Sequence, residues 1–150
     1  MRNIKISFPF FILFVVLISI QFSSLAETPK ERRARWDKGP RRINMRPYPV
    51  AVRENYKIFS KRCSKCHNLS RPINSDYVLP DEWQRYVKRM MRKPGSGINK
   101  KDGKKIYEFL TYDASIRKIG LLEEKLNNLS DEERKVQENK IAELKLQYEE

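Results

Sequence analysis

The stretch Cys63-Ser64-Lys65-Cys66-His67 decides how this sequence is interpreted. It contains both cysteines and the only histidine of a chain of 150 residues. Two thiols three positions apart can each form a thioether with a vinyl group of one porphyrin, and the histidine that follows is then held against the iron. This spacing predicts one covalently bound haem c, with Cys63 and Cys66 as the attachment residues and His67 as the proximal iron ligand.

Three other interpretations of the two cysteines stay open with less support. A structural zinc site needs four ligands, and the sequence has no further cysteine or histidine. A thioredoxin-type redox pair is expected in a βαβ setting, which this sequence does not predict. A disulfide across only two intervening residues is uncommon and strained. Haem attachment is therefore the leading interpretation.

The N-terminal segment has the pattern of a secretory signal. Basic residues precede an apolar run over residues 8–20, and the small residues Ser24 and Ala26 stand at the positions that signal peptidase inspects. The run is shorter than the roughly 20 residues that span a bilayer, although an uncleaved anchor that tethers the protein to the membrane is the alternative. We expect residues 1–26 to be removed and the remaining chain to lie in the periplasm, where thiols oxidise.

Composition divides the mature chain into three parts. Residues 27–49 form a basic, proline-containing arm with too few apolar groups to offset the entropy of ordering, so we expect it to be disordered or to wrap over the domain surface. Residues 50–112 hold most of the mature chain's aromatic residues and are expected to form the haem domain. Residues 113–150 are rich in Glu, Lys and Leu and contain no proline, which is typical of exposed helices.

The haem domain is predicted to be all-α, with three short helices. The first leads directly into Cys63, because apolar residues recur at helical spacing over residues 52–59. The second begins near residues 80–81 and stops before Pro94-Gly95, and the third covers about residues 99–111. No segment alternates convincingly with a period of two. A domain this small rarely holds a sufficient apolar core alone, so a cofactor is expected to add the missing bulk.

The second predicted helix carries the candidates for the distal iron ligand. Met90 and Met91 lie at its end, and the sequence offers no second histidine. Met90 shares a helical face with Trp83 and Val87, whereas Met91 lies about 100° further round the helix. We therefore expect Met90 to be the distal ligand, with Met91 as the alternative. That Met90 is ordinary core filler also stays open.

Residues 50–112 resemble a monohaem class I c-type cytochrome. The resemblance rests on the CSKCH motif, on the W…V..M helix with Met90 and on the turn at residues 94–97. The domain is similar to the haem domain of the reaction-centre cytochromes of green sulfur bacteria. The resemblance implies that both cysteines carry haem, that His67 and Met90 ligate its iron, and that the third helix packs across the first. Many family members place the methionine in a loop before the last helix, where this sequence departs from the pattern.

Supporting residues around the haem are less well defined. The proximal imidazole needs an acceptor for its second nitrogen, and a prolyl carbonyl commonly serves in the family, so Pro72 and Pro80 are candidates. Arg71 and Trp83 are candidate donors to the haem propionates. For each of these residues, an exposed or core-packing role is the alternative.

The predicted ligand set favours electron transfer. Iron held by His67 and Met90 is six-coordinate, which suits one-electron exchange and opposes substrate binding. The sequence contains no evident catalytic base, second metal site or phosphate loop, so we expect no enzyme activity and no small-molecule substrate. The leading hypothesis is a periplasmic one-electron carrier. Two alternatives stay open: the haem subunit of a larger periplasmic oxidoreductase, and a five-coordinate haem gas sensor.

Charge is distributed unevenly along the chain. The formal net charge is +13, and the positive charge is concentrated before residue 113, whereas residues 113–150 contain more acidic than basic residues. The basic part is expected to attract an acidic redox partner or an anionic membrane surface. Export disfavours nucleic acid as a partner. That the charge only keeps a small protein soluble is the alternative.

The C-terminal segment is predicted to contain two helices. Leucines and isoleucine recur at a 3-4-3 spacing over residues 119–129, and Ser130 with Glu133 forms a capping box that starts a second helix. The heptad register is not maintained across Ser130. Packing of this segment on its own haem domain and dimerisation are therefore both open, and so is the oligomeric state.

Overall fold

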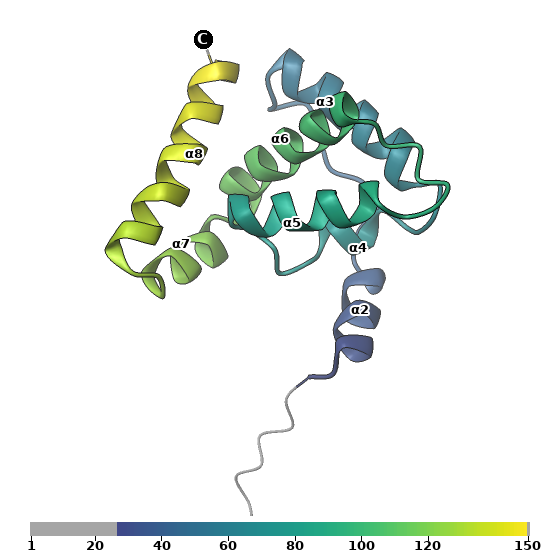
Figure 1. The fold of residues 1–150 in the computed structure, drawn as a ribbon, viewed down its shortest axis with the longest axis horizontal. Coiled ribbons are helices and arrows are strands. Elements are labelled where there is room, and N and C mark those ends of the chain that lie inside the picture. Colours follow the sequence, from purple (N-terminus) through teal and green to yellow (C-terminus); the bar gives the residue numbers. More distant parts are fainter. Residues whose placement is uncertain (1–26, 150) are drawn as a thin grey trace, which may run out of the picture. The chain divides into compact units, whose positions relative to one another are not determined.

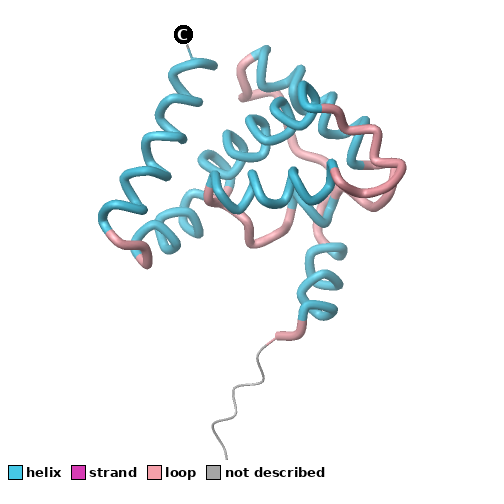
Figure 2. The backbone as a smooth tube through the Cα atoms, in the orientation of Figure 1, coloured by secondary structure: helices cyan, strands magenta, loops and turns pink. Residues whose placement is uncertain are grey.

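The computed structural model describes residues 27–149, so the predicted signal at residues 1–26 lies outside the described part. Within the described range the chain is all-α, with helices joined by loops and without strands (Figures 1 and 2). The predicted fold class is therefore confirmed. None of the described helices is long and apolar enough to cross a membrane.

The chain divides into two compact units between Arg32 and Arg33. The described end of the first unit holds the start of helix α2 (Pro29–Lys38). Its first turn is capped reciprocally, because the Thr28 N–H donates to Glu31 Oε2 (2.8 Å) and the Glu31 N–H donates to Thr28 Oγ1 (3.2 Å). This capping box starts a helix within the arm, which the sequence analysis did not predict.

The second unit contains the three helices predicted for the haem domain and three others. Helix α6 runs past the predicted end near residue 111, because its buried face continues through Ser115. The helices of this unit are α3 (Val50–Cys63), α4 (Ser70–Ile73), α5 (Pro80–Met91), α6 (Lys100–Arg117), α7 (Ile119–Asn127) and α8 (Asp131–Glu149).

Helix α6 is the centre of the packing. It contacts α3, α5, α7 and α8, and its interface with α3 is the most extensive (Figure 1). Phe59 of α3 and Phe109 of α6 are fully buried, with ring centroids 5.0 Å apart. The Tyr56 ring lies 5.2 Å from the Phe109 ring, centroid to centroid. This aromatic contact fixes the helix that ends in the CSKCH motif.

Helix α5 begins where the sequence predicts, and an acidic side chain in its first turn caps its start. Pro80 is the first helical residue, a position where its missing N–H costs nothing. The Glu82 carboxylate accepts hydrogen bonds from the N–H groups of Val78 (2.8 Å) and Leu79 (3.0 Å). Lys125 of α7 pairs with Glu82 at 2.6 Å. The start of α5 is therefore tied to the C-terminal segment.

Residues 33–49 of the arm are ordered, belong to the second unit and pack on the rest of it. Trp36 is buried, and its indole N–H donates to Asp76 Oδ2 at 3.3 Å. The Tyr48 hydroxyl donates to Asp113 Oδ1 at 2.8 Å. Of the two expectations for the arm, disorder is wrong for these residues, because buried aromatic side chains and buried hydrogen bonds offset the cost of ordering.

The C-terminal segment packs on residues 50–112 of its own chain. Leu122, Leu126 and Leu144 are buried in the same apolar cluster as α3, α5 and α6. The predicted capping box is confirmed, because the Ser130 N–H donates to Glu133 Oε2 (3.2 Å) and the Glu133 N–H donates to Ser130 Oγ (3.4 Å). Leucines that could have formed a coiled coil with a second copy therefore pack within the same chain.

A buried polar network fastens the end of α8. The Tyr148 hydroxyl donates to Glu108 Oε2 (2.6 Å) and accepts from Asn55 Nδ2 (2.8 Å). Glu108 and Asn55 are both buried, on α6 and α3 respectively. The hydroxyl thus joins three helices and satisfies two buried polar groups.

Tyr148→Phe is expected to lower the free energy of unfolding by about 1–3 kcal/mol, because it leaves the buried carboxylate and amide without this partner. Chemical denaturation measures the loss. The matched control is Leu146→Ala on the same helix, where the side chain is 61% exposed and the change is expected to stay within about 0.5 kcal/mol. Equal effects of the two substitutions would contradict the network's role.

A half-buried lysine closes the junction between α6 and α7. Lys118 Nζ donates to the carbonyl oxygens of Ser75 (2.7 Å) and Tyr77 (3.3 Å) and lies 5.2 Å from the centroid of a Trp83 ring. Burial, assisted by the charge of Arg117, lowers the pKa of Lys118 to about 8. The folded protein therefore binds fewer protons at Lys118 than the unfolded chain between about pH 8 and the ordinary lysine pKa of 10.5.

Because the unfolded chain binds more protons in that window, Lys118 makes stability rise as the pH increases. Lys118→Met is expected to remove this contribution, so that the wild type gains about 2 kcal/mol more than the variant between pH ~7.5 and ~9.5. Denaturation of both proteins at the two pH values gives the difference in slope. Identical slopes would show that Lys118 keeps an ordinary pKa in the folded protein.

Candidate functional site

The CSKCH motif lies where helix α3 ends. Cys63 is the last residue of α3 and is buried, whereas Cys66 is exposed in the turn that follows. The side chain of Asn68 accepts a hydrogen bond from the Ser70 N–H at 3.1 Å, just before the short helix α4. The motif is therefore held between two helices, with one thiol inside the fold and one at its surface.

His67 is half-buried and oriented by the residue that follows it. Its Nδ1 lies 3.0 Å from the carbonyl oxygen of Asn68, which leaves Nε2 as the nitrogen able to bind iron. The acceptor is therefore neither of the expected prolines. The Pro72 carbonyl accepts from Ser75 Oγ at 3.0 Å, and Pro80 is the first residue of α5.

Both cysteines, His67 and Met90 line one small cavity. Its volume is about 40 Å³, and its lining is mostly apolar. The four residues come from the end of α3, the turn after it and the end of α5. The other lining residues are Arg62, Lys93, Ser96 and Ile98.

The structure separates the two methionines that the sequence left as candidates. Met91 lies over Gly103 of α6, where an added Cβ would stand 2.6 Å from Met91 Sδ. Met91 lines a different groove, of about 400 Å³, between α5 and α6, together with Val87. Of these two methionines, Met90 lines a cavity with His67 and Met91 does not, among the cavities formed by the described residues.

Met90, Trp83 and Val87 were expected to share the face of α5 that meets the motif, and the structure differs from this prediction. Val87 lines the groove of Met91 rather than the cavity of Met90. Trp83 is fully buried and contacts Tyr77 and Tyr86, with ring centroids 5.6 and 5.8 Å away. It lines neither cavity that contains His67.

The loop after α5 completes the small cavity. Gly95 and Gly97 have φ values of 73° and 60°, which L side chains rarely adopt. Between them, Ser96 is buried, and its hydroxyl donates to the Met91 carbonyl at 3.2 Å. The two glycines thus let the chain turn so that Ser96 and Ile98 face Met90 across the cavity.

Two nearby groups have shifted pKa values with clear causes. Burial raises the pKa of the Cys63 thiol to about 12, and the neighbouring Cys66 acts in the same direction. Hydrogen bonding from Arg71 lowers the pKa of Asp37, and the positive charge of Arg71 also contributes. Because Arg71 forms this ion pair with the arm, it is not a free donor for haem propionates.

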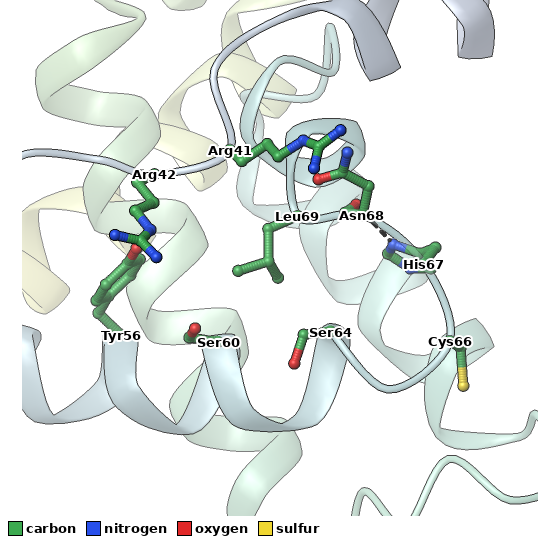
Figure 3. A pocket seen from close by; sticks show the side chains of 9 residues that line it. All are labelled: Arg41, Arg42, Tyr56, Ser60, Ser64, Cys66, His67, Asn68 and Leu69. Carbon is green, nitrogen blue, oxygen red and sulfur yellow. Dashed lines mark hydrogen bonds between the residues drawn. The ribbon is translucent and has the colours of Figure 1, made fainter.

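A second, larger cavity opens beside the motif. Its volume is about 590 Å³, and Cys66 and His67 line it too. Figure 3 shows Arg41 and Arg42 entering it from the loop after α2, opposite the α3 side chains. These two arginines were not predicted to be site residues, although two adjacent arginines in the arm could have indicated a binding role. The remaining lining residues are Tyr56, Ser60, Ser64, Asn68 and Leu69.

The donor atoms around the small cavity fit haem c, but the volume of the cavity is too small for a porphyrin. Two thiols, an oriented imidazole and a thioether are the groups that haem c requires. Cofactor pockets usually measure about 300–1,000 Å³, so the small cavity, at about 40 Å³, is below the size of a haem pocket.

Neither metal clusters nor known relatives add to this assignment. In residues 27–149, no group of three or more His, Cys, Asp or Glu side chains is placed to hold a metal ion. Comparisons with known protein families, with curated proteins and with solved structures find no match.

Proposed function

We propose that this chain is a periplasmic one-electron carrier with a single haem c. In this proposal Cys63 and Cys66 hold the haem through thioethers, His67 is the proximal iron ligand and Met90 is the distal ligand. The observation that carries it is the small cavity that all four residues line. Met90 is remote from the motif in sequence, so its presence there is independent of the CxxCH spacing.

The haem supplies an iron that exchanges one electron between ferric and ferrous states, and methionine ligation favours the ferrous state. The chain orients the ligands. The Asn68 carbonyl accepts the Nδ1 proton of His67 and so leaves Nε2 for the iron. The apolar lining around Met90 limits access of water to the thioether.

The proposal includes transfer to an acidic redox partner without substrate chemistry. Basic side chains border both cavities that contain His67, namely Arg41, Arg42, Arg62 and Lys93. Such a surface attracts an acidic partner and raises the rate of encounter at low ionic strength. An exported location follows from the predicted signal at residues 1–26. A haem subunit docked through its C-terminal segment has less support, because that segment packs on its own domain.

Met90→Leu tests the proposal at the distal ligand. The reduced and oxidised proteins are expected to keep covalent haem, but the weak near-infrared band that reports a sulfur–iron bond should disappear, and the reduction potential should fall. Met91→Leu is the matched control, since Met91 lies over Gly103. It should keep both the band and the potential. Loss of the band in Met91→Leu alone would overturn the assignment of Met90.

A further inference from the structure

The 590 Å³ cavity beside the motif has the side chains of an anion site. Apart from Cys66 and His67, its lining provides two guanidinium groups, three hydroxyls and one amide, and no carboxylate (Figure 3). All of these polar groups can donate hydrogen bonds. The donors come from both sides of the cavity, with the arginines on the arm and the hydroxyls on α3 and on Ser64 directly after it.

The two arginines are not neutralised within the described chain. Arg41 and Arg42 form no ion pair within residues 27–149, whereas Arg71 and Arg117 pair with aspartates. Their positive charge therefore stands uncompensated at the edge of a cavity without acidic groups. An anion bound there would gain charge-assisted hydrogen bonds at no cost in broken ion pairs.

The arm holds these arginines in place. Asn74 Nδ2 donates to the carbonyl oxygens of Trp36 (3.1 Å) and Pro40 (3.0 Å), directly before Arg41. Gly39 packs so closely that an added Cβ would stand 2.4 Å from Asn74. The backbone before Arg41 is therefore fixed on the domain, and less entropy is lost when the two side chains bind a ligand.

We propose that this cavity binds a phosphoryl group, either as free phosphate or as a small phosphate ester. The planar fork of arginine matches phosphate oxygens in a bidentate manner. The hydroxyls of Ser60 and Ser64 add neutral donors opposite the arginines. The cavity is larger than phosphate alone needs, and Leu69 with the Tyr56 ring gives a wall for the organic part of an ester.

Calorimetric titration of the purified full-length protein, in buffer without phosphate, tests the proposal with inorganic phosphate, glycerol 3-phosphate and uncharged glycerol. Both phosphates are expected to bind with about one equivalent, and glycerol is not. Tighter binding of the ester or of the free ion identifies the source of the phosphoryl group. The Arg41→Gln/Arg42→Gln variant is expected to bind at least about tenfold more weakly.

The matched control is Arg46→Gln/Arg53→Gln, which removes the same charge from exposed positions outside the cavity. It should bind like the wild type, and thermal unfolding confirms that both variants are folded. Absence of saturable binding, or an equal loss in both double variants, would overturn the proposal. Because binding is measured without any redox readout, this result and the test of the proposed function are independent.

Discussion

Replacing Cys63 and Cys66 together with alanine is expected to abolish covalent haem attachment. The two thiols are the only ones in the sequence, and each is needed for a thioether bond. Expressed with cytochrome c maturation factors, the wild type should retain its haem after denaturation and acid–acetone extraction. The double variant should release any haem it has bound. The absorbance of the extracted protein measures the difference directly.

The matched control replaces the two residues between the cysteines. Ser64→Ala/Lys65→Ala leaves both thiols and His67 in place, so haem should remain bound after extraction. Far-ultraviolet circular dichroism of both double variants checks that α3 still forms, because Cys63 is buried at its end. Haem retained by the alanine variant of both cysteines would refute the thioether attachment.

Trp83→Ala is expected to lower the free energy of unfolding by about 3–5 kcal/mol, the range for removing a large buried aromatic side chain. Trp83 is fully buried on α5, and its ring contacts Tyr77, Tyr86 and the Lys118 ammonium. Its loss leaves a cavity where α5 meets the junction of α6 and α7. Urea denaturation of the variant and the wild type measures the effect.

Ile116→Ala is the control for Trp83→Ala. Ile116 lies on α6 with 46% of its surface exposed, so its truncation should change stability by less than about 0.5 kcal/mol. If Trp83→Ala were as mild as Ile116→Ala, the aromatic cluster on α5 would not be part of the folded core. A variant too unstable to purify would agree with the predicted size of the loss.

Helices with strong local signals could be predicted from the sequence. Apolar spacing located α3, Pro80 located the start of α5, and the Ser130–Glu133 pair located the start of α8. The end of α6 was predicted too early, because the polar residues Asp113 and Ser115 are buried there by tertiary contacts and interrupt the apolar pattern. Periodicity does not record such contacts.

The order in the arm was harder to predict for the same reason. Trp36 is surrounded in the sequence by basic residues, and its partner Asp76 lies 40 residues away. The composition of a segment describes its own apolar content and not the surface on which it packs. Only the folded chain places Arg41 and Arg42 beside His67.

Residues of the candidate site were predictable where spacing alone defines them. The motif identifies its cysteines and His67 within five consecutive residues. The choice between Met90 and Met91 depended on which face of α5 meets the motif, and the expected face with Val87 was wrong. The hydrogen-bond acceptor for His67 was also predicted wrongly. The expectation named prolyl carbonyls further along the chain, whereas the acceptor is the carbonyl of the next residue, Asn68.

The central claim is a covalently bound haem c with histidine and methionine as iron ligands. Reduced-minus-oxidised spectra of the purified protein, with the pyridine haemochrome and the near-infrared region, test it most directly. The account predicts the haemochrome of a c-type haem in about one equivalent and the weak sulfur–iron band in the oxidised protein. A protein without covalent haem after expression with the maturation factors would contradict it.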